Sequence, residues 1–140
     1  MTGSRITVTR KINADRERVW TAMTDPDLVS HWMMGARLRS DWRPGSEITW
    51  SGEYKGQAFE DRGEIIEIDH GKRLVHTHFS PMSGADDVPE NYHRVEWRLE
   101  GEGNTTALTL EMPVESEEQG EEFESSWGIM LDSLKDVAER

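Results

Sequence analysis

The chain has 140 residues, a formal net charge of -12 and a sequence pI of about 4.8. This length suits a single domain with one core, spanning residues 1–140. Its acidic surface repels the phosphates of nucleic acids and anionic lipid headgroups, so we expect no nucleic-acid partner. The chain has no cysteine, which excludes disulfides, thiolate metal sites and a cysteine nucleophile.

The N-terminal segment MTGSRITVTRK has no apolar stretch of the kind that a signal peptide contains. No apolar run approaches the roughly 18–20 residues that a membrane-spanning helix needs. We therefore expect a cytoplasmic protein without membrane insertion, present as a monomer or a homodimer. Only 34% of the residues are apolar, yet six are tryptophan and seven methionine, so a few large side chains must supply much of the buried area.

The first elements follow from local patterns. Residues 5–12 (RITVTRKI) alternate apolar and polar side chains, which predicts a strand. Residues 13–24 then predict a helix that Asn13 caps. A second, short helix is predicted at residues 25–32, because Asp25 suits its N-cap position and a proline follows at the first helical position.

The middle of the chain has the pattern of an antiparallel meander. Short alternating segments are separated by glycine-, proline- and acid-rich turns. The predicted strands are residues 36–42, 46–54, 60–69, 73–79, 92–100 and 105–112.

A long helix is predicted for residues 116–140, where Ser116 and Gln119 fit a capping box. Its apolar stripe consists of Phe123, Trp127, Met130, Leu131, Leu134, Val137 and Ala138. The fold class is therefore α+β, with a curved antiparallel sheet of about seven strands wrapped around a long C-terminal helix and two short helices between strands 1 and 2.

Four stretches of the chain carry a family resemblance. They are INADRERVWTAMTDPDLVSHW at 12–32, DWRPGSEITW at 41–50, GEIIEIDHGKRLVHTHF at 63–79 and SSWGIMLDSLKDVAE at 125–139. They resemble the START-like (SRPBCC) superfamily with its helix-grip fold, and within it the homologues of the activator of the heat-shock-protein ATPase. The resemblance implies a deep cavity between sheet and helix that binds apolar small molecules or lipids. It implies no common set of catalytic residues.

Three histidines are candidates for chemistry. His76 and His78 are two residues apart on a predicted strand and therefore share a face, and His93 is expected close to opposite His78. Three imidazoles on one face are a pattern for zinc or another borderline metal. The alternatives are solvent-facing histidines or polar groups that orient a ligand. The alternation of residues 73–79 does not decide which face is inside. We predict pocket polar groups, with no metal site and no cofactor.

Large apolar side chains on the expected inner faces are the second group of candidates. Such pockets are mostly apolar with a few placed polar groups, and methionine suits an adaptable wall. The predicted ligand-binding residues are Trp32, Met34, Trp50, His76, His78, His93, Trp97, Met112, Trp127, Met130 and Leu131.

The leading functional hypothesis is intracellular binding of a hydrophobic or amphipathic small molecule or lipid, without catalytic residues. A cyclase- or hydrolase-like enzyme, with a pocket histidine as general acid or base, is the first alternative. The second is a stress-related, co-chaperone-like interaction module, which requires an exposed apolar patch at Met33, Met34 and Trp42. The sequence contains no phosphate-cradling glycine loop, HExxH or GxSxG motif.

Overall fold

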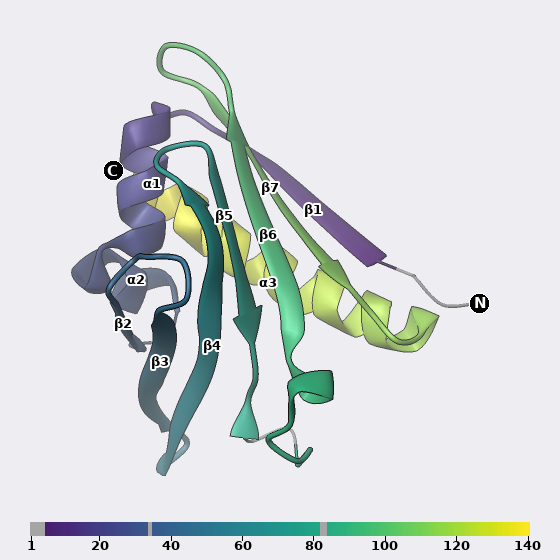
Figure 1. The fold of residues 1–140 in the computed structure, drawn as a ribbon. Coiled ribbons are helices and arrows are strands. Elements are labelled where there is room, and N and C mark those ends of the chain that lie inside the picture. The colour runs from purple at the N-terminus through teal and green to yellow at the C-terminus, as the bar shows by residue number, and fades with distance from the viewer. Residues whose placement is uncertain (1–4, 34, 82–83) are drawn as a thin grey trace.

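The computed structural model describes residues 5–33, 35–81 and 84–140. They form one seven-stranded antiparallel sheet with a long helix across one face and two short helices at one end (Figure 1). The strands are β1 Arg5–Ile12, β2 Arg37–Ser40, β3 Glu47–Tyr54, β4 Gln57–Asp69, β5 Arg73–His78, β6 His93–Glu100 and β7 Thr106–Pro113. The helices are α1 Arg16–Thr24, α2 Pro26–Trp32 and α3 Glu117–Ala138, with a 3-10 turn, η2, at Pro89–Asn91.

The strand order is β1-β7-β6-β5-β4-β3-β2, so every neighbour from β2 to β7 is also consecutive in the chain. The first strand returns to pair with the last, and α1 and α2 bridge from it to the opposite edge of the sheet. The core lies between the concave face of the sheet and α3 (Figure 1). This confirms the α+β architecture predicted from the sequence.

Two helix starts have the caps expected from their sequences. The Asp25 side chain accepts a hydrogen bond from the backbone N–H of Asp27, with proline at the first position of α2. The Ser116 hydroxyl accepts from the N–H of Gln119 at 3.0 Å. The Gln119 side chain in turn accepts from the N–H of Glu115, one residue before the cap. Both helices therefore begin with backbone donors satisfied by side chains.

The prediction that Asn13 caps the first helix is wrong. The cap is Asp15, whose Oδ1 accepts from the backbone N–H of Arg18 at 2.7 Å, so α1 begins at Arg16. The backbone N–H of Asn13 instead donates to Glu139 Oε2 at the end of α3, 2.8 Å away. Residues 13 and 14 form a bend after β1, and α1 begins only after Asp15.

The inward face of β5 consists of Leu74, His76 and His78. Their direct partners on β6 are Trp97, Val95 and His93, respectively, which also face inward. Alternation along β5 could not identify its inward face, because Val75 is buried as well as Leu74. The pairing register with β6 places Val75 on the outer face, with Glu96 as its direct partner.

A β-bulge in β4 shifts the alternation of this 13-residue strand. Ile65 pairs with His76 and Glu67 with Val75, so Ile66 is an extra residue, and its side chain is 38% exposed. Because one residue is added, Ile68 returns to the inside beyond the bulge.

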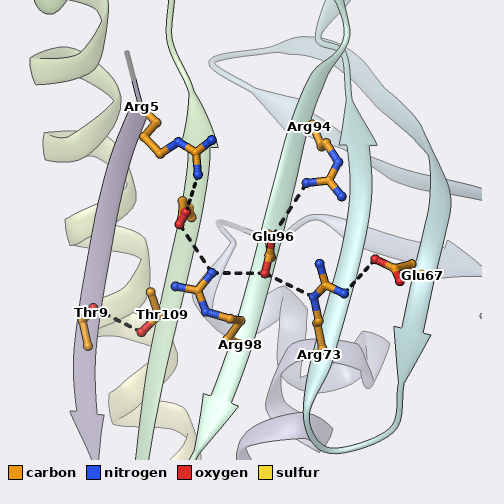
Figure 2. Close-up of polar contacts among 9 residues, drawn as sticks. Arg5, Thr9, Glu67, Arg73, Arg94, Glu96, Arg98 and Thr109 are labelled. Atoms are coloured by element: carbon orange, nitrogen blue, oxygen red, sulfur yellow. Dashed lines mark hydrogen bonds and ion pairs between the residues drawn. The ribbon is translucent and has the colours of Figure 1, made fainter. Parts of the chain in front are cut away.

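The outer face of the sheet carries an ion-pair ladder across five strands, and Figure 2 shows most of it. From β1 to β4 its members are Arg5, Glu111, Arg98, Glu96, Arg73 and Glu67. The guanidinium groups of Arg73 and Arg98, at 3.2 and 3.1 Å, lower the pKa of Glu96, with the Arg73 hydrogen bond as the largest cause. Each exposed pair contributes little, but the ladder keeps this face charged and solvated.

β4 and β5 approach unusually closely at Gly63. A Cβ atom on Gly63 would lie 1.8 Å from the backbone oxygen of Thr77, while the N–H of Glu64 donates to Thr77 Oγ1 at 2.9 Å. Only glycine allows this backbone contact. The close approach occurs beside Asp61 and His78, two side chains that meet on the inner face.

We expect Gly63→Ala to lower the free energy of unfolding by about 1–3 kcal/mol, because the added methyl group forces β4 away from β5. Urea unfolding followed by tryptophan emission measures this loss. Glu60→Ala on the exposed side of the same strand is the control, with an expected change within about 0.5 kcal/mol. Equal stabilities of the two variants would contradict the close contact.

Candidate functional site

A cavity of about 360 Å³ lies between the inner face of the sheet and the helices α2 and α3. Its volume falls in the range of small-molecule sites, roughly 300–1,000 Å³, and its surface is mostly apolar. The lining residues are Met23, Trp32, Met33, Ala36, Leu38, Trp42, Ile48, Trp50, Phe59, Asp61, Leu74, His76, His78, Ser80, Asn91, His93, Trp97, Met112, Phe123, Ser126, Trp127 and Met130.

Three tryptophans from different elements form a connected wall of the cavity. Trp97 on β6 is in edge contact with Trp32 of α2 and Trp127 of α3, with ring centroids 6.3 and 5.6 Å apart. The indole N–H of Trp32 donates to the carbonyl of Ala22 at 2.7 Å, and that of Trp97 to His76 Nε2 at 3.0 Å. Because both N–H groups are satisfied, these two rings offer the cavity apolar surface without an unmet donor.

His76 is held as a neutral imidazole. It is 2% exposed, and burial lowers its pKa to about 4. Its Nδ1 lies 2.8 Å from the carbonyl oxygen of Thr77, which can only accept, so Nδ1 carries the proton. Its Nε2 accepts from Trp97, whose indole nitrogen can only donate. Both ring nitrogens are therefore occupied, and His76 has a structural role in fixing Trp97.

His78 and Asp61 form the polar end of the cavity. His78 Nε2 lies 3.0 Å from Asp61 Oδ2, and the ring of Trp50 packs against both His76 and His78 at centroid distances of 5.2 Å. Trp50 is also the direct cross-strand partner of Asp61. The second carboxylate oxygen, Asp61 Oδ1, is buried and has no hydrogen-bond partner among the described residues.

His93 lies directly opposite His78, as predicted, and is half-buried with its ring edge-on to Phe123 at 5.5 Å. Burial is the largest cause lowering its pKa, followed by the neighbouring His78, while Glu115 acts in the opposite direction. Within residues 5–33, 35–81 and 84–140, no three histidine, aspartate or glutamate side chains are grouped so as to hold a metal ion. The three histidines thus share a face without forming a ligand set.

Most of the predicted binding residues line this cavity. They are Trp32, Trp50, His76, His78, His93, Trp97, Met112, Trp127 and Met130. Leu131 is fully buried in the core beside the cavity and is not among the described lining residues. Met34 lies outside the described residues. The structure places these side chains, and their roles in binding stay predictions.

Sequence reasoning missed Asp61 because a charged residue in the segment EDRG indicates a surface position. The signal that could have found it is parity. Asp61 alternates in phase with the buried Ile65, with Gly63 between them. Of the three residues proposed for an exposed interaction patch, Met33 and Trp42 are instead partly buried against the core and line the cavity, and Met34 lies outside the described residues.

None of the described helices is long and apolar enough to cross a membrane. The model of the family described as "Activator of Hsp90 ATPase homolog 1-like protein" matches residues 13–139. No curated protein matches the chain.

Solved structures share the fold over nearly the whole chain. The solution structure of ChR145 from Cytophaga hutchinsonii is 36% identical and has a TM-score of 0.84, covering 97% of this chain and 94% of that one. The crystal structure of CalU16 from Micromonospora echinospora is 26% identical, with a TM-score of 0.75 and coverage of 97% and 76%. The solution structure of the Aha1 dimer from Colwellia psychrerythraea is 21% identical, with a TM-score of 0.74 and coverage of 97% and 96%, and supports the fold alone.

The buried His76 predicts a pH dependence of stability. The pKa of His76 is about 4 in the folded chain against the ordinary histidine value of 6.5, so between these values the unfolded state binds more protons and acid favours unfolding. We expect this group to remove about 2 kcal/mol of stability between pH 7 and pH 5.

The measurement is urea unfolding at pH 7 and pH 5 for the wild type and His76→Gln. Glutamine keeps an acceptor for the Trp97 N–H but does not titrate. The free energy of unfolding of His76→Gln should therefore fall less between pH 7 and pH 5 than that of the wild type, and the difference is the contribution of His76. The titrations of all other groups, His93 included, are common to both proteins. An equal loss in both would show that His76 is not the buried neutral group described.

Proposed function

We propose that this chain, which belongs to the family of activator of Hsp90 ATPase homolog 1-like proteins, binds an apolar or amphipathic small molecule in the cavity under α3. The observation that carries the proposal is the cavity itself, about 360 Å³ of space walled by tryptophan and methionine side chains. Core packing normally leaves few voids larger than a water molecule. A cavity of this size in a chain with so little apolar composition therefore favours a ligand.

The chemistry of the wall supports an apolar body for the ligand. In the tryptophan wall, the indole N–H groups of Trp32 and Trp97 are both bonded to acceptors within the protein, so neither ring presents an unmet donor to a ligand. Aromatic surface of this kind favours the transfer of apolar area out of water by about 25 cal/mol for each Å². Flexible side chains, such as Met33 and Met130, let one cavity adjust to more than one shape.

The structure gives less support to two specific forms of the other hypotheses, an enzyme that uses His76 and an exposed patch that contains Met33 and Trp42. An enzyme that used His76 as its general acid or base would need a free ring nitrogen, and both are hydrogen-bonded. An interaction module would need Met33 and Trp42 exposed together, and both pack against the core. Ligand binding requires neither of these conditions.

We expect the neutral fluorescent probe N-phenyl-1-naphthylamine to bind the wild type saturably, at one molecule per chain. Met130→Trp should weaken binding at least roughly tenfold, or about 1.4 kcal/mol, because the larger side chain occupies cavity space. The measurement is a fluorescence titration of the probe, with unfolding curves to confirm that both variants fold.

Ile129→Trp is the matched control. Residue 129 immediately precedes Met130 on α3 and is 67% exposed, so the same aromatic group is added outside the cavity. We expect its affinity within about twofold of the wild type, since surface changes are usually worth less than 0.5 kcal/mol. An absence of saturable binding to the wild type, or equal losses in the two variants, would reject the proposal.

A further inference from the structure

We infer that the cavity selects amphipathic ligands whose polar end is a hydrogen-bond donor, above all a protonated amine, and that Asp61 receives this group. The inference rests on the proposed function and adds a chemical class to it. It combines three observations at one end of the cavity: an unmatched acceptor, a lining without fixed positive charge, and aromatic rings beside the acceptor.

The unmatched acceptor is Asp61 Oδ1. The other oxygen, Oδ2, lies 3.0 Å from His78 Nε2, whereas Oδ1 is buried without a partner among the described residues. An ionised carboxylate can only accept hydrogen bonds, and a buried acceptor left unpaired destabilises the fold. The Asp61 side chain lines the cavity and keeps 18% of its surface exposed. Oδ1 itself faces away from the cavity space, so a ligand donor bound here pairs with it after a rotation of the Asp61 carboxylate, and that pairing offsets the cost of the unpaired oxygen.

The lining offers little to an anionic ligand. Among the described residues that line the cavity there is no lysine or arginine, and Asp61 is the only carboxylate. Burial lowers the pKa of His93, which favours its neutral form. A carboxylate or phosphate head would therefore meet like charge from Asp61 and from a chain of net charge -12.

Aromatic rings next to Asp61 favour a cation further. Trp50 is the direct cross-strand partner of Asp61, and its ring lies against His78, 5.2 Å between centroids. The face of an indole ring attracts ammonium groups, most strongly where water is excluded. A protonated amine at this end would have a carboxylate for its hydrogen bonds and an aromatic face for its remaining surface.

The test uses three compounds with one apolar body and different heads: naphthylethylamine, naphthylethanol and naphthylacetate. Each competes with N-phenyl-1-naphthylamine at pH 7, and its affinity is read from the loss of probe fluorescence. We expect the amine to bind at least tenfold more tightly than the carboxylate, with the alcohol between them.

Asp61→Asn should abolish this order, because the amide lacks the charge and presents donors as well as an acceptor. We expect the amine to lose at least fivefold in affinity, while the alcohol changes less than about twofold. Glu60→Gln is the control, since it makes the same change of net charge at the preceding, exposed residue of β4. It should leave the order of the three compounds unchanged.

The outcomes separate the two proposals. If neither the probe nor any of the three compounds binds, the proposed function fails and this inference fails with it. If the compounds bind with equal affinity, or the carboxylate binds best through His78, the cavity binds ligands but the assignment to Asp61 is wrong. Should Asp61→Asn fail to fold, the order measured on the wild type still decides, because a preference for the carboxylate overturns the inference.

Discussion

The hydrogen bond from Trp97 to His76 is the interaction on which the shape of the cavity depends. It joins the central strands β5 and β6 on their inner face, and it fixes the ring that contacts both α2 and α3 through Trp32 and Trp127. The bond requires His76 to remain neutral, with its proton on the nitrogen that faces the Thr77 carbonyl. Burial therefore has two effects at once, since it removes the charge from the imidazole and strengthens the bond that positions the tryptophan wall.

The two ends of the inner face differ in how their polar groups are satisfied. Both ring nitrogens of His76 and the indole N–H of Trp97 have partners within the protein, so this part behaves as core. At Asp61 and His78 one carboxylate oxygen has no partner among the described residues. Natural interiors contain few such groups, and those that persist call for an explanation. Here the explanation we offer is a ligand that brings its own donor.

The sequence predicts the elements well because their signals are local. Alternation at Ile6, Val8 and Ile12 is enough for β1, and Asp25 before a proline is enough for α2. The predicted cap of α1 was wrong, because Asn13 and Asp15 are both residue types that favour the N-cap, and the backbone N–H of Asn13 is bonded to Glu139 at the far end of the chain. Local patterns contain no information about such a contact.

The candidate site was predicted only in part, because some of its positions depend on pairing between strands and not on local patterns. Aromatic side chains such as Trp97 and Trp127 are buried wherever the sheet and α3 meet, so hydrophobicity alone identifies them. The inward face of β5 could not be chosen, since Val75 is buried as deeply as Leu74 and only the register with β6 separates them. Asp61 was missed because a charged residue indicates a surface position, although its side chain points inward.

The extra residue at Ile66 divides β4 into two parts with separate patterns of inward and outward side chains. Ile68, beyond it, packs against the core, and Asp61, before it, lines the cavity. Since a bulge absorbs a change of one residue in alternation, the two parts need not share one pattern of inward positions. A polar residue such as Asp61 can therefore face the cavity on one side of the bulge while Ile68 on the other side keeps its inward position.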